Sequence, residues 1–500
     1  GFLKMDLLGL RTLSIIDNCV SMINQAHKLS LKATEIPFTD PKIFSLISSG
    51  RTMGLFQLET SGMKKAILDL KPSSFDDVVA LLALFRPGPM DNIPSYAARK
   101  EGKEKPTYIN PDLKDILSST YGIIVYQEQI MQIAVKMAGF SMADADSFRR
   151  AISKKDSEKL SGLQKAFIGG AVRQGYNDKH AESVFNHIYK FADYGFNKSH
   201  SVSYAILACQ MGYLKAFYPA EFYAAILETA SGSNDVKFGE YISEIKEQNI
   251  RLLPPDINTS AAYFSVDSDA LLFPLSAIKN VPNAIVKAIV DERQRGPYRD
   301  FFDFVDRLSL YKISGVHVTR LIEAGCFDRL EKSRASLIAS IPAAFQFASM
   351  RHGENGQMPI DLSFLPKPAL VRAKDDPLEN LNREYEVIGM MVSGSPLRYK
   401  KDQLAAYKVV DMSSVKERYD TLNIAGILKS KKIIKTKKGQ PMAFLSVYDE
   451  TGDMEIVVFP NVFTECAQML EKNATLIITG HTDREKKGNF IADKVRLLEG

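Results

Sequence analysis

The chain has 500 residues, enough for about three domains that each bury a core of their own. Its 45% hydrophobic and 25% charged residues are those of a folded globular protein, which excludes an intrinsically disordered chain. The 64 lysines and arginines exceed the 59 aspartates and glutamates by only +5, so a nucleic-acid partner has to be argued from where the charges cluster.

The cysteines and the apolar runs argue against a disulfide-stabilised protein and against a membrane-spanning one. Cys19, Cys209, Cys326 and Cys466 lie far apart, which provides no metal-ligand pair and disfavours a disulfide framework, so we expect reduced thiols in a cytoplasmic protein. No stretch approaches the ~20 apolar residues that span a bilayer. The first residue is glycine and not methionine, and we expect it to lie in the middle of a longer chain.

About the first 230 residues have predominantly helical patterns. The segment 121–140 repeats apolar residues at spacings of three and four, which predicts an amphipathic helix. Further helices are predicted over 181–191 and 203–217, the second ending before Pro219.

The middle of the chain changes character. Residues 251–258 are expected to form an extended link. From residue 277 to about 330, the pattern predicts short helices joined by tight turns. The stretch 331–375, which ends in glycines and prolines, predicts a mobile linker.

From residue 421 onward, apolar and polar residues alternate with a period of two. Strands are predicted over 423–430, 443–450, 453–459 and 475–482, and a helix over 462–470. About five short strands with one helix between the third and the fourth is the layout of an OB barrel.

The most unusual local feature is a basic cluster formed by Arg149, Arg150, Lys154 and Lys155. Arginine forks match phosphate oxygens and lysines supply point charge, which is the combination that a triphosphate site needs. A solvated helix face is the alternative. Against it, the arginines adjoin apolar residues, and no acidic residue at helical spacing accompanies them within 149–153.

A second candidate site is the polar loop 194–201, which opens a predicted helix. Helix N-termini present free N–H groups that favour anions, and aromatic residues beside Asn, Lys and His could stack on and hydrogen-bond a nucleotide. Ordinary capping of the helix by Ser199 or Ser201 is compatible with this function.

Two further segments could contact nucleic acid. The turn in 275–283, followed by a predicted helix to about Gln294, would place backbone N–H groups at a phosphate, with a weaker second copy around 316–330. An ordinary helical hairpin is the alternative. In the predicted barrel, lysines from Lys429 to Lys438 suit a groove for single strands, unless they only protect a strand edge. The stacking partners expected there are Phe444 and Tyr448.

Together these segments resemble the bacterial replicative DNA polymerase III alpha subunits, the C-family polymerases of DnaE type. The motifs that carry the resemblance are KMDLLGLRTL at 4–13, GLFQLETSGMK at 54–64, LFRPGPM at 84–90, YGIIVYQEQIM at 121–131, RRAISKK at 149–155, YGFNKSHSVSYA at 194–205 and LSAIKNVPNAIVKAI at 275–289. The predicted barrel follows the hairpin element, as in the DnaE type and not the PolC type.

The resemblance implies a multidomain α+β protein, with mainly helical fingers and a helix-hairpin-helix region followed by a small all-β OB barrel. The implied parts are the end of the palm and a connection at 1–50, the fingers at 51–230, a duplex-binding helix-hairpin-helix region at 231–335, a linker with a clamp-binding peptide and a small connecting subdomain at 336–420, and the OB domain at 421–500.

The implied function is that of a DNA-directed DNA polymerase, a nucleotidyltransferase that adds deoxynucleotides to a primer 3′ end by two-metal phosphoryl transfer with Mg²⁺. The implied partners are primer-template DNA, single-stranded template, deoxynucleoside triphosphates, a sliding clamp and other replisome subunits. The family's PHP domain, thumb and paired palm aspartates are absent, so we expect these residues alone to be inactive. A non-enzymatic nucleic-acid-binding module is the alternative, and a tRNA-binding synthetase fragment is a weaker one.

The resemblance also assigns roles to single residues. Asp6 corresponds to one of the catalytic carboxylates and would bind magnesium, and His200 would test the sugar for a 2′-hydroxyl. Nucleotide contacts are expected from Lys4, Arg86, Arg149, Arg150, Lys154, Lys155, Asn197, Lys198 and His200. DNA contacts are expected from Lys279, Asn280, Val281, Asn283, Lys431, Lys432, Lys435 and Phe444, and clamp contacts from Gln357, Ile360 and Leu362. Asn280 and Pro282 replace the glycines usual in this family's hairpin, which weakens the case for close phosphate approach there.

Overall fold

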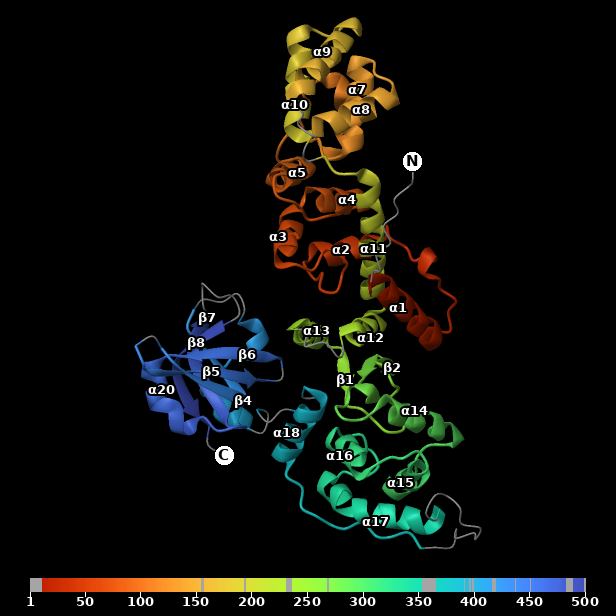
Figure 1. Cartoon of the computed structure of the whole chain (residues 1–500), viewed down its shortest axis with the longest axis vertical. Helices are drawn as coiled ribbons and strands as arrows, with labels where there is room; N and C mark the ends of the chain where they lie inside the picture. Colours follow the sequence, from red (N-terminus) through yellow and green to blue (C-terminus); the bar gives the residue numbers. More distant parts are fainter. Residues whose placement is uncertain are drawn as a thin grey trace. The chain divides into compact units, whose positions relative to one another are not determined.

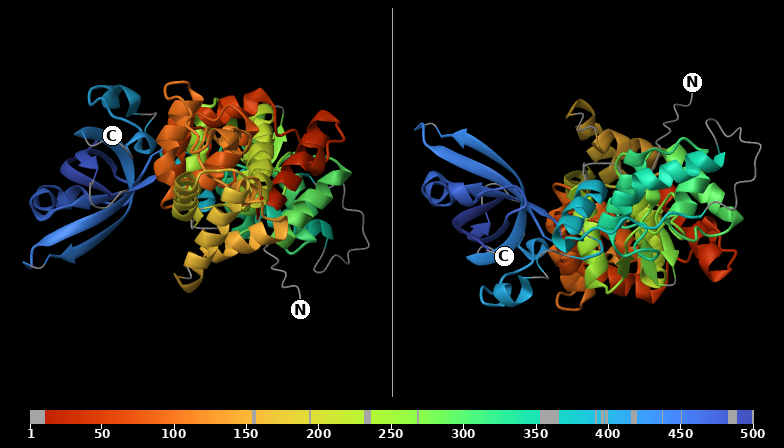
Figure 2. Two further views of the ribbon diagram at one scale, coloured as in Figure 1. Left: turned by 90° about the horizontal axis from the view of Figure 1, so that it is seen from above. Right: turned by 90° about the horizontal axis from the view of Figure 1, so that it is seen from below.

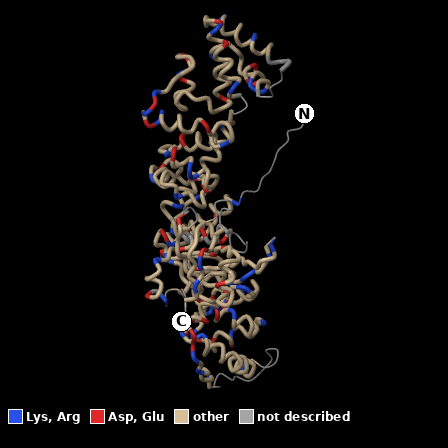
Figure 3. Tube along the Cα trace, turned by 90° about the vertical axis from the view of Figure 1, so that its left-hand side faces the viewer, with Lys and Arg blue, Asp and Glu red and all other residues tan. Residues whose placement is uncertain are grey.

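The computed structural model forms two compact units, Gly1–Phe222 and Tyr223–Gly500 (Figure 1). The structure describes residues 11–153, 157–192, 195–230, 236–267, 269–352, 366–390, 392–394, 397, 400–415, 420–436, 438–449, 451–482 and 489–498. Cations and carboxylates are interspersed along the chain, in keeping with its small net charge (Figure 3).

The first unit is helical, as predicted. Its helices are α1 (Arg11–His27), α2 (Pro41–Ser48), α3 (Ser61–Leu70), α4 (Phe75–Leu84), α5 (Ile93–Lys100), α6 (Lys114–Leu117), α7 (Gln127–Ala138), α8 (Met142–Ser153), α9 (Ser157–Arg173), α10 (Asp178–Ala192) and α11 (Lys198–Phe217), with α12 (Pro219–Ala230) crossing into the second unit. The predicted helices over 181–191 and 203–217 are confirmed as parts of α10 and α11.

Two packed groups of helices make up this unit. Helices α7 to α10 enclose a shared aromatic core in which the rings of Phe148 and Phe167 stack at 5.6 Å, with Phe185 against both. Helix α11 lies along α4 and α2 (Figure 1). The Ser201 hydroxyl on α11 donates to the carbonyl of Val79 at 2.6 Å, which fixes α11 against α4.

The predicted helix over 121–140 is wrong in its first third. Helix α7 begins only at Gln127, because the buried Gln129 side chain accepts the backbone N–H groups of Val125 and Tyr126 at 2.9 and 3.0 Å. The apolar residues before it are buried in extended backbone instead. A short apolar run fits either structure, so periodicity did not distinguish them.

After α12 the second unit continues with α13 (Val236–Glu247) and a small sheet, of which only the first strand lies within the predicted extended link 251–258. Strand β3 (Ala270–Leu272) pairs in parallel with β1 (Arg251–Leu253) and antiparallel with β2 (Ser265–Asp267). The short helices predicted from residue 277 to about 330 are confirmed. They are α14 (Asn283–Glu292), α15 (Phe301–Ser309) and α16 (Gly315–Glu323).

A long helix, α17 (Arg334–His352), occupies the first half of the predicted linker, which is a correction. It was missed because Pro342 lies inside it and its apolar residues follow no single stripe. Contacts with α15 hold it, including the pair of rings Phe302 and Phe347. The predicted clamp peptide with Gln357, Ile360 and Leu362 lies outside the described residues. Helices α18 (Pro377–Ile388) and α19 (Lys401–Ala405) follow.

The chain then forms the predicted OB barrel. Five strands close in the order β4-β5-β6-β8-β7, namely β4 (Leu422–Lys435), β5 (Pro441–Tyr448), β6 (Asp453–Val458), β7 (Thr475–Thr482) and β8 (Asn489–Leu497). Helix α20 (Pro460–Cys466) lies between the third and fourth strands, where a helix was predicted (Figure 2). Alternate residues such as Ile424, Leu445 and Ile456 fill the interior, so residues between them face outward.

All four cysteines are buried free thiols, as expected. Among the described helices, none has the length and apolar character needed to cross a lipid bilayer.

Candidate nucleotide and nucleic-acid sites

Two motifs distant in sequence meet where α11 begins. The loop 195–197 runs parallel to 125–127, since the N–H of Phe196 donates to Val125 O at 3.0 Å and the N–H of Gln127 to Phe196 O at 2.9 Å. Gly195 permits this approach, because a Cβ there would lie 3.2 Å from Cγ of Gln127 and 3.3 Å from Cδ1 of Ile130. The pairing therefore fixes the predicted nucleotide loop to the start of α7.

The N-terminus of α11 is occupied by internal acceptors. Asn197 caps the helix, its Oδ1 accepting the His200 N–H at 2.8 Å. The Glu128 carboxylate accepts the Lys198 N–H at 3.0 and 3.1 Å. The cap is therefore Asn197, and not Ser199 or Ser201, which the sequence offered as the ordinary alternative to an anion site. An incoming anion would have to replace Glu128 to reach the Lys198 amide.

A row of aromatic side chains follows one side of α11. The Arg86 guanidinium lies 4.4 Å from the centre of the Phe196 ring, and Phe196 contacts His200 at 5.5 Å. His200 contacts Tyr204 at 4.2 Å, and Tyr204 contacts Phe56 at 5.0 Å. Burial lowers the pKa of Arg86 from its ordinary value. The row brings Arg86 and His200 close to one loop, as a nucleotide pocket requires.

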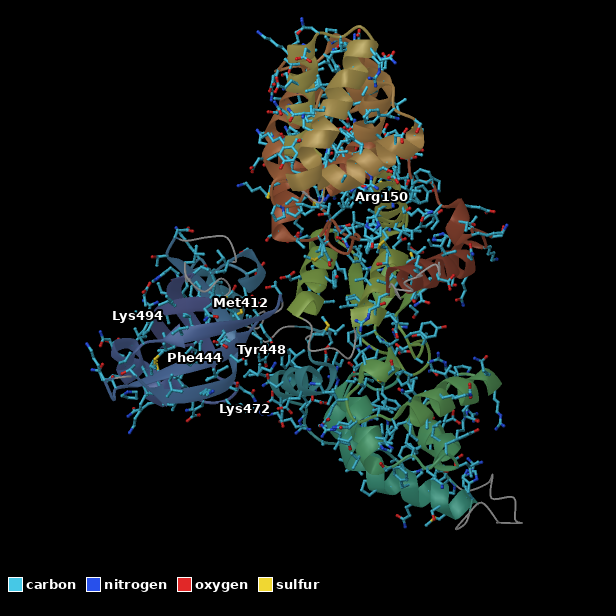
Figure 4. The ribbon with its side chains drawn as sticks, turned by 45° about the horizontal axis from the view of Figure 1, so that its top comes forward. Arg150, Met412, Phe444, Tyr448, Lys472 and Lys494 are labelled. Atoms are coloured by element: carbon cyan, nitrogen blue, oxygen red, sulfur yellow. The ribbon has the colours of Figure 1, made fainter. Side chains whose placement is uncertain are left out.

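The basic cluster has an acidic partner that the sequence analysis missed. Asp146 pairs with Arg149 at 2.7 Å and with Arg150 at 2.7 Å, one turn away on α8 (Figure 4, where Arg150 is labelled). Hydrogen bonding from Arg149 lowers the pKa of the Asp146 carboxyl. The side chain of Arg149 is 18% exposed and that of Arg150 is 68% exposed. Lys154 and Lys155 lie outside the described residues.

Gln127 joins this cluster to the nucleotide loop. Its Oε1 accepts from Nη1 of Arg149 at 3.0 Å, and its Nε2 donates to Gly195 O at 3.0 Å. The segments around Arg86, Gln127, Arg149 and His200 are thus connected through side-chain and backbone contacts.

The predicted metal site depends on residues near the start of the chain. Lys4 and Asp6 lie outside the described residues. Within the described ranges, no group of three or more His, Cys, Asp or Glu side chains is placed to hold a metal ion.

The turn that precedes α14 contains a residue in the left-handed backbone conformation. Asn280 has φ of +64°, so it adopts the left-handed conformation that a glycine would supply. Val281 is buried, and any DNA contact there would come from its backbone. Asn283 opens α14 and is exposed. Lys279 contacts α18, its N–H donating to Val387 O at 2.9 Å and its Nζ to Glu386 O at 3.1 Å.

A second turn of the same form lies just before the predicted position 316–330. Lys312 has φ of +59°, Ile313 is buried like Val281, and Ser314 caps α16 by accepting the His317 N–H. In both turns the left-handed residue lies three positions before the first helical residue.

On the barrel, Lys432 pairs with Phe444 across β4 and β5, and neither belongs to the set of interior residues. Phe444, which is labelled in Figure 4, is half-buried. Lys431 Nζ donates to Leu470 O at 2.6 Å, whereas Lys435 is exposed. Among the described strands, residues 431–435 pair with β5 alone. Protection of a strand edge therefore remains an alternative explanation for these lysines.

Tyr448 does not present a ring for stacking on a base, contrary to the sequence analysis. It is 2% exposed, and Tyr385 of α18 stacks on it at 3.9 Å with an angle of 12° between the rings. The Tyr385 hydroxyl donates to Asp453 at 2.7 Å, and Lys429 bonds both groups.

Several residues of the site were missed for different reasons. Gln127 and Glu128 belong to a motif quoted for the resemblance but received no role, because their partners are distant in sequence. Asp146 lies three and four residues before the arginines and a wider search at helical spacing would have found it. Tyr204 and Phe56 also lie in motifs quoted for the resemblance but received no role, since their contact depends on the fold.

Comparisons with known proteins agree with these regions. Residues 12–175 match the model of the bacterial DNA polymerase III alpha subunit finger domain. Residues 249–337 match a helix-hairpin-helix motif, and residues 422–498 match an OB-fold nucleic acid binding domain.

Curated relatives match along the whole chain. DNA polymerase III subunit alpha of Bacillus subtilis (strain 168) is 42% identical over 504 residues, which cover 100% of this chain and 45% of the relative. The proteins of the same name from Staphylococcus aureus (strain COL) and Aquifex aeolicus (strain VF5) are 37% and 36% identical, covering 100% and 97% of this chain and 46% and 41% of the relatives. The chain thus spans less than half the length of these relatives. It belongs to the family of bacterial DNA polymerase III alpha subunits.

Proposed function

We propose that this chain supplies the nucleotide-binding and DNA-binding part of a replicative DNA-directed DNA polymerase, which adds deoxynucleotides to a primer 3′ end. The main support is the network that joins Arg86, Gln127, Arg149 and the loop before α11 within the region similar to polymerase fingers. Such a network holds cations, amides and aromatic rings around one loop, which suits a nucleoside triphosphate.

Individual roles follow from exposure. Arg150 is the more exposed arginine of α8 and would neutralise phosphate charge. Lys198 and His200 are exposed at the start of α11, where they would meet the phosphates and the sugar. In this proposal His200 excludes a 2′-hydroxyl by its position next to Phe196 and Tyr204.

The metal in this proposal is magnesium, with Asp6 as a ligand and Lys4 as its companion near the triphosphate. When bound, magnesium would polarise the attacking hydroxyl and neutralise the leaving pyrophosphate. Asp6 is a carboxylate, the ligand type that magnesium prefers.

Two regions of the second unit would bind DNA. The turns at Asn280 and Lys312 would contact the phosphate backbone of a duplex. Backbone N–H groups can donate to phosphate oxygens without contacting the edges of the bases. Lys432 and Phe444 would contact a single strand, one by charge and the other by stacking. As part of the same proposal, the peptide with Gln357, Ile360 and Leu362 would dock on a sliding clamp alongside other replisome subunits in the cytoplasm.

Single-nucleotide incorporation by the full-length alpha subunit carrying this segment tests the proposal. Arg150→Ala should raise KM for the incoming nucleotide by about tenfold or more, since a charge-assisted bond to phosphate is lost. Lys65→Ala on α3, a lysine distant in sequence from the proposed contacts, is the matched control and should leave KM unchanged. An Arg150→Ala variant with normal incorporation and weaker DNA affinity would support a non-enzymatic nucleic-acid-binding module instead.

A further inference from the structure

The two adjacent arginines of α8 have different surroundings. Nε and Nη2 of Arg149 both donate to Oδ1 of Asp146, at 3.2 and 2.7 Å, and its Nη1 donates to Gln127. Arg150 pairs with the other oxygen of Asp146 through Nη2 alone among the described contacts, and its side chain is 68% exposed. Arg149 is therefore committed to internal partners, whereas Arg150 faces solvent.

The bonds of Arg149 lead to the nucleotide loop through one residue. Gln127 accepts from Arg149 and donates to Gly195 O, both at 3.0 Å. Its own backbone N–H donates to Phe196 O at 2.9 Å. Gly195 packs so closely on Gln127 that a displacement of this side chain would move the loop. Asp146, Arg149 and Gln127 thus form a continuous support beneath residues 195–197.

We propose that Arg149 is a positioning residue, which acts through Gln127 to hold the loop that presents Phe196, Asn197 and His200, while Arg150 contacts the triphosphate. This inference rests on the proposed function, and it separates two arginines that the sequence analysis assigned to the same role.

The two roles differ in what a lysine can replace. An ammonium group supplies charge to a phosphate, so lysine should serve at position 150. The planar guanidinium of Arg149 spans Asp146 and Gln127 with separate nitrogens, and a single ammonium group cannot reproduce that fork. Rescue by lysine therefore distinguishes a phosphate ligand from a positioning residue.

The test is single-nucleotide incorporation by the full-length alpha subunit carrying Arg149→Ala, Arg149→Lys, Arg150→Ala, Arg150→Lys, Gln127→Met or Arg149→Ala with Gln127→Met. We expect Arg150→Lys to retain kcat/KM within about threefold of the unsubstituted protein, and Arg149→Lys to be as impaired as Arg149→Ala. Gln127→Met should reproduce the Arg149→Ala defect. The double variant should be no worse than either single variant, because both break the same support.

Hydrogen exchange provides a readout that does not depend on catalysis. Amides in 195–200 should exchange faster in Arg149→Ala and Gln127→Met, but not in Arg150→Ala. Full rescue by Arg149→Lys, or defects of Arg149→Ala and Gln127→Met that multiply in the double variant, would overturn the inference. If Arg150→Ala also leaves incorporation intact, the proposed function itself fails. Unchanged exchange in 195–200 in the Gln127→Met variant contradicts the inference even where Arg149 variants unfold.

Discussion

Asn280 and Lys312 occupy equivalent places in the turns that precede α14 and α16, and they share an uncommon backbone conformation. Their φ values are +64° and +59°, in the region where residues with a Cβ are disfavoured. Asparagine tolerates this region better than most residues, because its short polar side chain can bond to nearby backbone. Asn280 therefore maintains the left-handed turn that a glycine would otherwise supply.

Substitution of Asn280 should separate backbone conformation from side-chain chemistry. Asn280→Gly should leave the free energy of unfolding within about 0.5 kcal/mol of its original value. Asn280→Val should lower it by about 1–2 kcal/mol, because a β-branched residue is strained at positive φ. Urea denaturation measures both changes. Duplex affinity should fall in Asn280→Val alone, and an equal loss in Asn280→Gly would show that the amide itself contacts DNA.

Helix α18 connects helix α17 with the barrel, because it contacts each of them through a different residue. Glu384, which is fully buried, accepts from Arg334 of α17 at 3.0 Å. Tyr385 instead contacts the barrel, where it stacks on Tyr448 and donates to Asp453. Because adjacent residues of one helix anchor it on both sides, we expect α17, α18 and the barrel to unfold together.

Tyr385 tests this coupling. Tyr385→Ala should lower the free energy of unfolding by about 3–5 kcal/mol, as for other buried aromatic residues. Tyr385→Phe keeps the stacked ring and loses the bond to Asp453, so it should cost about 1 kcal/mol. Calorimetry should then resolve a separate barrel transition in Tyr385→Ala only. A single cooperative transition in that variant would show that α18 does not couple these parts.

Across the whole chain, patterns of neighbouring residues predicted the elements whose structure depends on neighbouring residues. The alternation from residue 421 onward gave the barrel strands, since the period of two is set by the pleat. By contrast, α17 has no apolar stripe and contains Pro342, so contacts with α15 override its weak local pattern. The cover on Tyr448 comes from α18, more than sixty residues earlier, and no local pattern contains it.

The candidate site divides in the same way. Arg86, Arg149 and His200 were expected near one another only through the resemblance, and the structure connects their segments. The bond from the Lys198 N–H at the start of α11 to Glu128 was not predictable, because Glu128 belongs to another helix, α7. Internal partners of this kind depend on tertiary packing and not on spacing along one helix.

The measurement that tests the central claim most directly is binding of primer-template DNA by this chain, titrated against salt. The account predicts that the logarithm of the affinity falls linearly with the logarithm of the salt concentration. Lys432→Ala should make that slope less steep by about 1, because one contact to phosphate is lost. Phe444→Ala should weaken binding by about 1–3 kcal/mol and leave the slope unchanged. Affinity that is absent, or that does not respond to salt or to either substitution, would contradict the assignment of this chain to the DNA-binding part of a polymerase.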